Sequence, residues 1–411
     1  MSNTKDNINL KESLGFIDVF FISLGYIIGA GIYSLIYLTT KYAGKYTWMS
    51  FIIGGLISLM TALSYRDLSE HFDTNASDYD YITQGLSMKL KYPISFLLIF
   101  MLLLTATVLV IAFTNITKEI YKNAPYIVVS IITILIPTII NIYDVKFTSN
   151  INIGISLLET LVLVVLIFMN FLTPNLGSVK NINFDTVKYL TNMFKKIPSI
   201  FHGAFLTFFA YSGFETIPKL AEETKDSKKN IPKAIISSLL VAITLYVFVS
   251  LSLNNILGVN KVSETKNPIS LAFKSILGSK TKPFIDFVTL MSIFNTILIT
   301  LLFTSRQFKA LSEKNILPDF ISKVNSKTKT PINSILLISV IVLILVLSLN
   351  INISSHFVNL LLVVLFVLIN SSNIALYNKK IIKKNGLPYY SYLGLGSTLI
   401  IVYELIKKIV N

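Results

Sequence analysis

Cysteine is absent from the 411 residues of this chain, which excludes disulfides, thiolate metal sites and cysteine nucleophiles. Histidine is scarce, and His71, His202 and His356 lie too far apart in sequence to form a zinc motif. The sequence has no glycine-rich phosphate loop of the GxxxxGK[ST] type, so we expect no work driven by ATP. We expect no metal site and no cofactor, and the transporter interpretation developed below requires no enzyme activity.

Charge is also low, at 14% of residues, whereas hydrophobic residues make up 53% of the chain. They gather in blocks of about 18–25 residues, and a helix of that length crosses a hydrocarbon core about 30 Å thick. The sequence therefore predicts an all-α polytopic membrane protein with eleven spans. The expected spans are residues 16–40, 46–64, 93–114, 125–143, 151–172, 199–221, 233–254, 284–304, 333–350, 356–376 and 391–406.

The net charge of +15 comes mainly from lysines in the connectors between apolar blocks. Such lysines are typical of the cytoplasmic loops of membrane proteins, so we do not expect nucleic-acid binding. The first block follows a polar stretch and runs on without a cleavage site, which argues against a signal peptide. We expect a cell-membrane protein with a cytoplasmic N-terminus, and the sequence leaves its oligomeric state open.

Two glycine clusters interrupt apolar spans at matching depth. The first, SLGYIIGAGIYS, carries Gly29, Ala30 and Gly31, and the second, FFAYSGFET, carries Ser212 and Gly213. Close helix packing is one explanation, since small residues are common at membrane helix contacts. Paired interruptions in two five-span halves, however, are typical of inverted-repeat transporters, and glycine tolerates the broken backbone that they need.

This repeat pattern predicts the organisation of the chain. We expect a cytoplasmic segment 1–15, a ten-helix core 16–376 with repeats 16–172 and 199–376, and a peripheral segment 377–411 whose last span is weak. A helix broken at mid-membrane presents free N–H groups to an anion and free carbonyls to an ammonium group. One such site suits both poles of an amino acid.

Four sequence motifs in order resemble those of the amino acid/polyamine/organocation (APC) permease superfamily, over residues 14–380. They are GYIIGAGIYS, TALSYRDLSEHF with YDYI, FFAYSGFETIPKLAEETKDSKKNIPKAI, and TSRQFKALSEKNILPDFISKVNSKTKTPINSI. The chain departs from the family in DTNASDYDY, where a proline and paired glycines are usual, and in having eleven spans where twelve are common. The resemblance implies a secondary transporter core with broken first and sixth helices.

The resemblance also implies roles for individual residues. In the family the first helix offers N–H groups to the substrate carboxylate, and the sixth offers carbonyls to the amino group. Phe209 matches the aromatic residue that closes over substrate as a gate, with plain packing as its alternative. The residues expected at the substrate site are Tyr26, Gly29, Ala30, Gly31, Phe209, Ala210, Ser212 and Gly213.

Two carboxylates lie within predicted spans. Glu159 is alone in ISLLETLVLVVLIF, where an ionised carboxylate is costly unless it is paired, faces a cavity or is protonated. We predict that it couples transport to protons, with a structural hydrogen bond as the alternative. Glu215 follows the second glycine cluster and matches an acidic position of the family, so we predict a gating or helix-positioning role.

Together these features predict a secondary active transporter that moves amino acids across the membrane by alternating access, either proton-coupled or as an exchanger. The alternatives are a polyamine or organic-cation transporter and, less favoured, an amino acid sensor on the same fold. The sequence does not separate proton from sodium coupling, or uptake from efflux.

Overall fold

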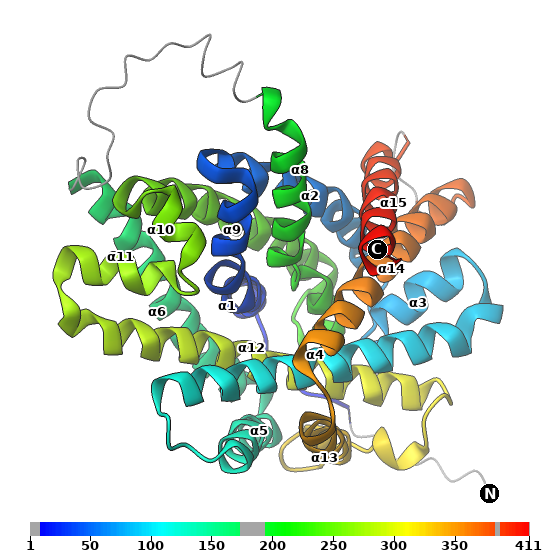
Figure 1. The fold of residues 1–411 in the computed structure, drawn as a ribbon. Coiled ribbons are helices and arrows are strands. Elements are labelled where there is room, and N and C mark those ends of the chain that lie inside the picture. Colours follow the sequence, from blue (N-terminus) through cyan, green and yellow to red (C-terminus); the bar gives the residue numbers. More distant parts are fainter. Residues whose placement is uncertain (1–8, 173–193, 383–386, 411) are drawn as a thin grey trace, which may run out of the picture.

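The computed structural model describes residues 9–172, 194–382 and 387–410, so most of the predicted loop 173–198 lies outside the described residues. The described chain is built almost wholly of helices (Figure 1). In order these are α1 (Phe16–Ala43), η1 (Gly44–Tyr46), α2 (Thr47–His71), α3 (Ser77–Gly85), η2 (Met88–Leu90), α4 (Lys91–Ile120), α5 (Tyr126–Tyr143), α6 (Val145–Leu172), α8 (Ile197–Ala210), η3 (Phe214–Glu223), α9 (Ser227–Leu257), α10 (Val259–Glu264), α11 (Pro268–Leu277), η4 (Ser279–Thr281), α12 (Lys282–Glu313), η5 (Asp319–Ile321), α13 (Ile332–Ser348), α14 (Ile351–Asn378) and α15 (Tyr389–Val410), where η marks a 3-10 helix.

Eight segments of the described chain are long and apolar enough to cross a membrane. They cover most of α1, the end of α1 with α2, and α4, α5, α6, α9, α12 and α14. The large apolar side chains exposed on their outer surfaces, such as Phe168 on α6 and Ile139 on α5, fit a lipid environment. The predicted all-α polytopic membrane fold is thereby confirmed.

The three other predicted spans are shorter or peripheral. Helix α8 has 14 residues and is continued by η3, and the apolar helix α13 has 17. The weak eleventh span is helical as α15, which packs against α14 and α2. Its start is tied in by Ser391, which hydrogen-bonds Ser64 of α2 and Asn373 of α14.

The packing of the spans repeats with an offset of five. Helix α1 packs against α8, α2 against α9, α4 against α12, and α5 against α13. Each pair joins a span to the one five spans later, as expected of two five-span halves related by an inverted repeat. Figure 1 shows α5 and α13 side by side at one edge of the bundle, below α4 and α12.

The bundle has two ends that differ in their loops. The end here called the N-terminal end carries Leu14, α3, the end of η3 and the end of α12. The far end carries α10 and α11, which Figure 1 shows on the left, whereas α3 is on the right. Helix α1 runs from the N-terminal end to the far end, and α12 runs in the reverse direction.

The prediction that the first span is broken at Gly29 and Gly31 is wrong. Helix α1 is continuous from Phe16 to Ala43, so the N–H groups of this segment lie within a regular helix. The prediction for the sixth span is confirmed, because α8 ends at Ala210 and the chain turns before η3 begins at Phe214.

The glycines of α1 serve close helix packing. A Cβ atom at Gly25 would overlap the Ser156 hydroxyl of α6, and one at Gly29 would overlap the Thr296 hydroxyl of α12. Small residues allow such approach between membrane helices, because backbones can come close where no side chain intervenes. The alternative left open by the sequence therefore explains this cluster.

Replacing Gly25 by alanine tests this packing. The new methyl group would meet Ser156 and Asn295, and such overpacking costs about 1–3 kcal/mol. We expect Gly25→Ala to lower the apparent melting temperature of the detergent-solubilised protein. Gly154→Ala on α6 is the matched control, because a Cβ atom there would have no described neighbour within 4 Å and alanine favours a helix by about 0.5–1 kcal/mol. Equal melting of Gly25→Ala and wild type would contradict the tight contact.

Candidate functional site

A cavity of about 820 Å³ enters the bundle from the far end, between α1, α4, α11 and α12. Along α1 it is lined by Tyr37, Tyr33 and, farthest from the far end, Gly29. Along α12 it extends from Lys282 to Ile293. Its deep part therefore reaches the glycine cluster singled out in the sequence. Tyr33, Thr289 and Ile293 were not predicted from the sequence, because nothing in the sequence of an apolar helix indicates which face borders a cavity.

The interruption of the sixth span is a short turn between α8 and η3. Gly213 has φ +130°, a conformation that favours glycine, and its N–H donates to Glu215 Oε2 at 2.6 Å. The Ser212 hydroxyl and N–H both donate to the Phe209 carbonyl, at 2.8 and 3.2 Å. Glu215 is buried and holds the end of the turn through this hydrogen bond, and its gating or positioning role stays a prediction.

The two glycine clusters lie against each other, although only one of them is broken. A Cβ atom at Gly31 would come 2.7 Å from the Tyr246 hydroxyl and would overlap the Ala210 carbonyl oxygen. Tyr246 donates from α9 to the carbonyls of Ile27 at 2.7 Å and Ala210 at 3.4 Å. Tyr246 thus joins the middle of α1 to the end of α8, a role that the sequence did not reveal.

The remaining predicted site residues surround this junction. The ring of Tyr26 lies over Gly213, close enough that any side chain there would collide with it. The Thr300 hydroxyl on α12 donates to the Tyr26 hydroxyl at 3.4 Å. Phe209 is half-buried, with its ring 5.4 Å from that of Phe208, and is not among the described residues that line the cavity. The backbone of Ala30 lies within α1, and its side chain is outside the described part of the structure.

Glu159 lies in a buried polar cluster between α6 and α12. Its carboxylate accepts hydrogen bonds from the Ser292 hydroxyl and, at 3.3 Å, from Asn295 Nδ2. Ser292 also reaches the Gly29 carbonyl at 3.3 Å, which links the cluster to the deep part of the cavity. No lysine, arginine or histidine forms an ion pair with Glu159 in the described chain.

The same cluster extends along α6 towards α1. Asn152 Nδ2 donates to Asn295 Oδ1 at 3.0 Å, and Asn295 Nδ2 also donates to Ser156 at 3.2 Å. Asn152 is fully buried, and its Oδ1 has no hydrogen-bond partner among the described residues. Asn152, Ser156 and Glu159 are spaced by three to four residues, so helical periodicity places them on one face of α6. The spacing of these three residues could be read from the sequence. Which residues of α12 contact them could not.

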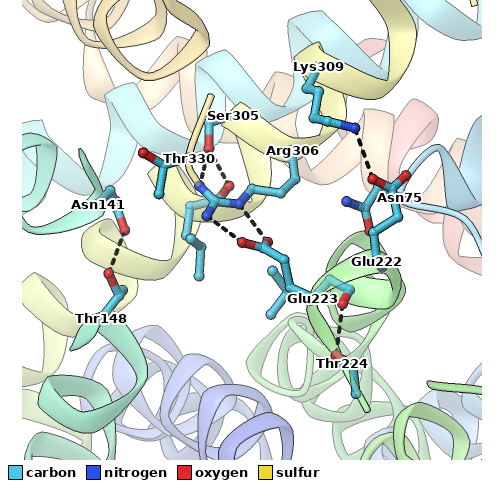
Figure 2. A network of polar contacts seen from close by, with 12 residues as sticks. Asn75, Asn141, Thr148, Glu222, Glu223, Thr224, Ser305, Arg306, Lys309 and Thr330 are labelled. Atoms are coloured by element: carbon cyan, nitrogen blue, oxygen red, sulfur yellow. Dashed lines mark hydrogen bonds and ion pairs between the residues drawn. The ribbon is translucent and has the colours of Figure 1, made fainter. Parts of the chain in front are cut away.

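The N-terminal end is closed by a buried ion pair. Arg306 of α12 donates from Nε and Nη2 to the two carboxylate oxygens of Glu223, at 2.7 and 2.8 Å, and both side chains are fully buried. Figure 2 shows Arg306 extending from α12 towards Glu223 at the end of η3. Such bidentate pairs fix geometry as well as charge, so this one clamps η3 to α12.

The main chain of Glu223 makes a second connection. Its carbonyl oxygen accepts the N–H groups of Ser13 at 3.0 Å and Leu14 at 2.9 Å, and Lys225 N–H donates to the Leu14 carbonyl at 2.8 Å. These bonds form the isolated bridge between Leu14 and Thr224. Glu223 therefore joins the segment before α1, the end of η3 and α12.

Further ion pairs surround this point. Lys219 and Asp78 form a fully buried pair at 2.5 Å, and Asp78 also accepts the Tyr65 hydroxyl at 2.8 Å. Lys309 contacts Glu222 at 2.9 Å beside the Arg306 pair (Figure 2). Asp78 belongs to DTNASDYDY, the stretch that departs from the family pattern, and here it covers η3 at the N-terminal end.

Comparison with known proteins agrees with this architecture. The family model described as amino acid permease matches residues 14–409. A branched-chain amino acid permease of Bacillus subtilis is 26% identical over 353 residues, which is 80% of this chain and 73% of the relative. A methylthioribose transporter of the same species is 25% identical over 391 residues, 90% of this chain and 82% of the relative.

Plant proteins are also similar. Cationic amino acid transporter 7 of Arabidopsis thaliana is 23% identical over 345 residues, which is 79% of this chain and 58% of the relative. The chain thus spans a little more than half the length of this plant transporter.

The ion pairs at the two ends of the bundle provide a matched test of stability. Glu223→Gln leaves Arg306 buried without a counter-charge, and breaking such a pair costs about 3–5 kcal/mol. Glu119→Gln at the far end breaks a pair with Lys266 whose side chains are 65% and 78% exposed, for which the expected cost is about 1 kcal/mol or less. Thermal melting in detergent should show a large decrease only for Glu223→Gln. Similar melting of the two variants would contradict the assignment of Glu223 to the closed end.

Proposed function

The chain belongs to the amino acid permease family, and from that premise we propose that it carries amino acids across the cell membrane by alternating access. The observation that carries this proposal is the contrast between the two ends of the bundle. A cavity runs from the far end to Gly29 in the middle of α1. At the N-terminal end, the described pocket of about 630 Å³ is lined by no residue of α1, and buried ion pairs hold η3 to α3 and α12. A transporter caught with one side open has this arrangement.

We assign the N-terminal end to the cytoplasm. Lysines concentrate at this end, including Lys225 before α9 and Lys228 and Lys229 in its first turn, and positively charged segments stay on the cytoplasmic side. The described state is then outward-facing. Transport requires a second state in which η3 leaves α12 at the N-terminal end while the far-end cavity closes.

We place the substrate site between the deep part of the cavity at Gly29 and the turn of the sixth span, which meets α1 at Tyr26 and Gly31. The carbonyls of Phe209 and Ala210 accept hydrogen bonds from side-chain hydroxyls, and a substrate ammonium group can take the place of such donors. Gly29 and Gly31 contribute by letting α1 approach α12 and the end of α8 closely, since their N–H groups belong to a continuous helix. Tyr26 of α1 and the turn residues Ser212 and Gly213 complete the proposed substrate site. Phe209 is its proposed gate.

Glu159 is the coupling residue of this proposal. A buried carboxylate without a cation is stable in its protonated form, because ionisation in a medium of low dielectric constant is costly. Ser292 contacts both Glu159 and the Gly29 carbonyl, so a change of charge at Glu159 alters the helix that lines the cavity. Protonation from the open side can thereby accompany substrate binding.

Uptake into liposomes tests transport and coupling together. Purified protein should accumulate a labelled amino acid, and an inward proton gradient should accelerate this uptake. Glu159→Gln mimics the protonated side chain, so it should abolish the acceleration while exchange of labelled for unlabelled substrate persists. The control is Glu264→Gln on α10, where the carboxylate is exposed and has no ion pair in the described chain.

Two outcomes would count against the proposal. No accumulation or exchange of any amino acid would contradict the transport function. Unchanged proton dependence in Glu159→Gln would leave transport standing and reduce Glu159 to a hydrogen bond between α6 and α12.

A further inference from the structure

The charged side chains of the far-end cavity lie at its rim. Among the described residues, Lys266, Lys274 and Lys282 line this part, with Glu119 and Asp286 as the acids. Glu119 contacts Lys266 at 3.3 Å, and Asp286 contacts Lys282 at 2.5 Å. Both acids are thus neutralised, and the three lysines leave the rim with a net positive charge. A cation that enters the cavity therefore meets electrostatic repulsion.

The deep part of the cavity is lined by uncharged side chains in the described chain. They include Gly29, Tyr33, Ala112, Thr289 and Ile293. Tyr33, Thr289 and Ile293 are each more than 90% buried, so a ligand in contact with them is largely out of water. Apolar and aromatic surfaces of this kind stabilise apolar ligand groups by removing them from water.

The carboxylate of Glu159, which lies near the deep part of the cavity, is not available to pair with a charged ligand there. Glu159 is fully buried and is not among the described residues of the cavity lining. Its oxygens already accept hydrogen bonds from Ser292 and Asn295. A guanidinium or ammonium group on a substrate side chain would therefore lose its hydration in the deep part without gaining a counter-charge, and so would a carboxylate.

From this arrangement we propose that the permease selects amino acids with uncharged, apolar side chains and rejects cationic amino acids, polyamines and acidic amino acids. The inference rests on the proposed transport function, since it names the substrate class of the same site. It separates this chain from the organic-cation reading that the sequence left open.

A ligand panel on the purified protein tests the proposal directly. A compound that binds the folded state raises the melting temperature, so leucine, phenylalanine, arginine, lysine, putrescine and glutamate are compared at one concentration. We expect leucine or phenylalanine to raise the melting temperature and the four charged compounds to leave it unchanged. This comparison needs no variant and decides the proposal by itself.

A matched pair of variants tests the physical cause. Ile293→Asp places a carboxylate in the deep part of the cavity, and Ile293→Asn places a neutral side chain of similar size there. Arginine should stabilise Ile293→Asp but not Ile293→Asn, and leucine should stabilise both less than wild type. Stabilisation of Ile293→Asn by arginine would show that the missing counter-charge is not what excludes cations.

The outcomes separate the substrate class from the function. A shift of wild type by arginine, lysine, putrescine or glutamate as large as that by leucine would overturn the substrate class and leave transport standing. A panel in which no compound shifts the melting temperature would also overturn the substrate class, whereas the transport function fails only if liposomes accumulate or exchange no amino acid.

Discussion

The buried contact between Arg306 and Glu223 is the constraint on which the closed end of the bundle depends. Neither charge reaches water, so each is tolerated only because the other is present. Glu223 also holds the segment before α1 through its carbonyl oxygen, which accepts the N–H groups of Ser13 and Leu14. One residue at the end of η3 therefore controls whether α1, η3 and α12 stay together at the N-terminal end.

Two fully buried carboxylates in this protein differ in what surrounds them. Glu223 accepts two hydrogen bonds from an arginine, whereas the described partners of Glu159 are the neutral Ser292 and Asn295. The first forms a bidentate contact between η3 and α12, and the second carries the proton coupling that we propose. Both contact α12, since Arg306 and Ser292 belong to the same helix, so α12 connects the polar cluster around Glu159 with the ion pairs of the N-terminal end.

The sequence was sufficient for eight of the eleven expected spans, the all-α class and the break of the sixth span, because these depend on local hydrophobicity and on Gly213. It failed at the first span, where Gly29 and Gly31 suggested an open backbone. Glycine permits both a break and a close approach, and only the positions of Thr296 and Ala210 on neighbouring helices distinguish the two. The ion pairs at the N-terminal end could not be predicted for a similar reason. Arg306 and Glu223 are 83 positions apart, and no local sequence pattern indicates that they meet.

The complete lack of cysteine allows the central claim to be measured with single introduced thiols. Ile293→Cys reports on the cavity, and Leu220→Cys reports on the buried face of η3 beside Glu223. With a membrane-impermeant reagent, Ile293→Cys should react from the α11 side. Leu220→Cys should stay unreactive until Glu223→Gln is added, and then react from the N-terminal side. Equal labelling of Leu220→Cys in the Glu223 and the Glu223→Gln backgrounds would contradict the claim that the Arg306–Glu223 pair keeps the N-terminal end closed.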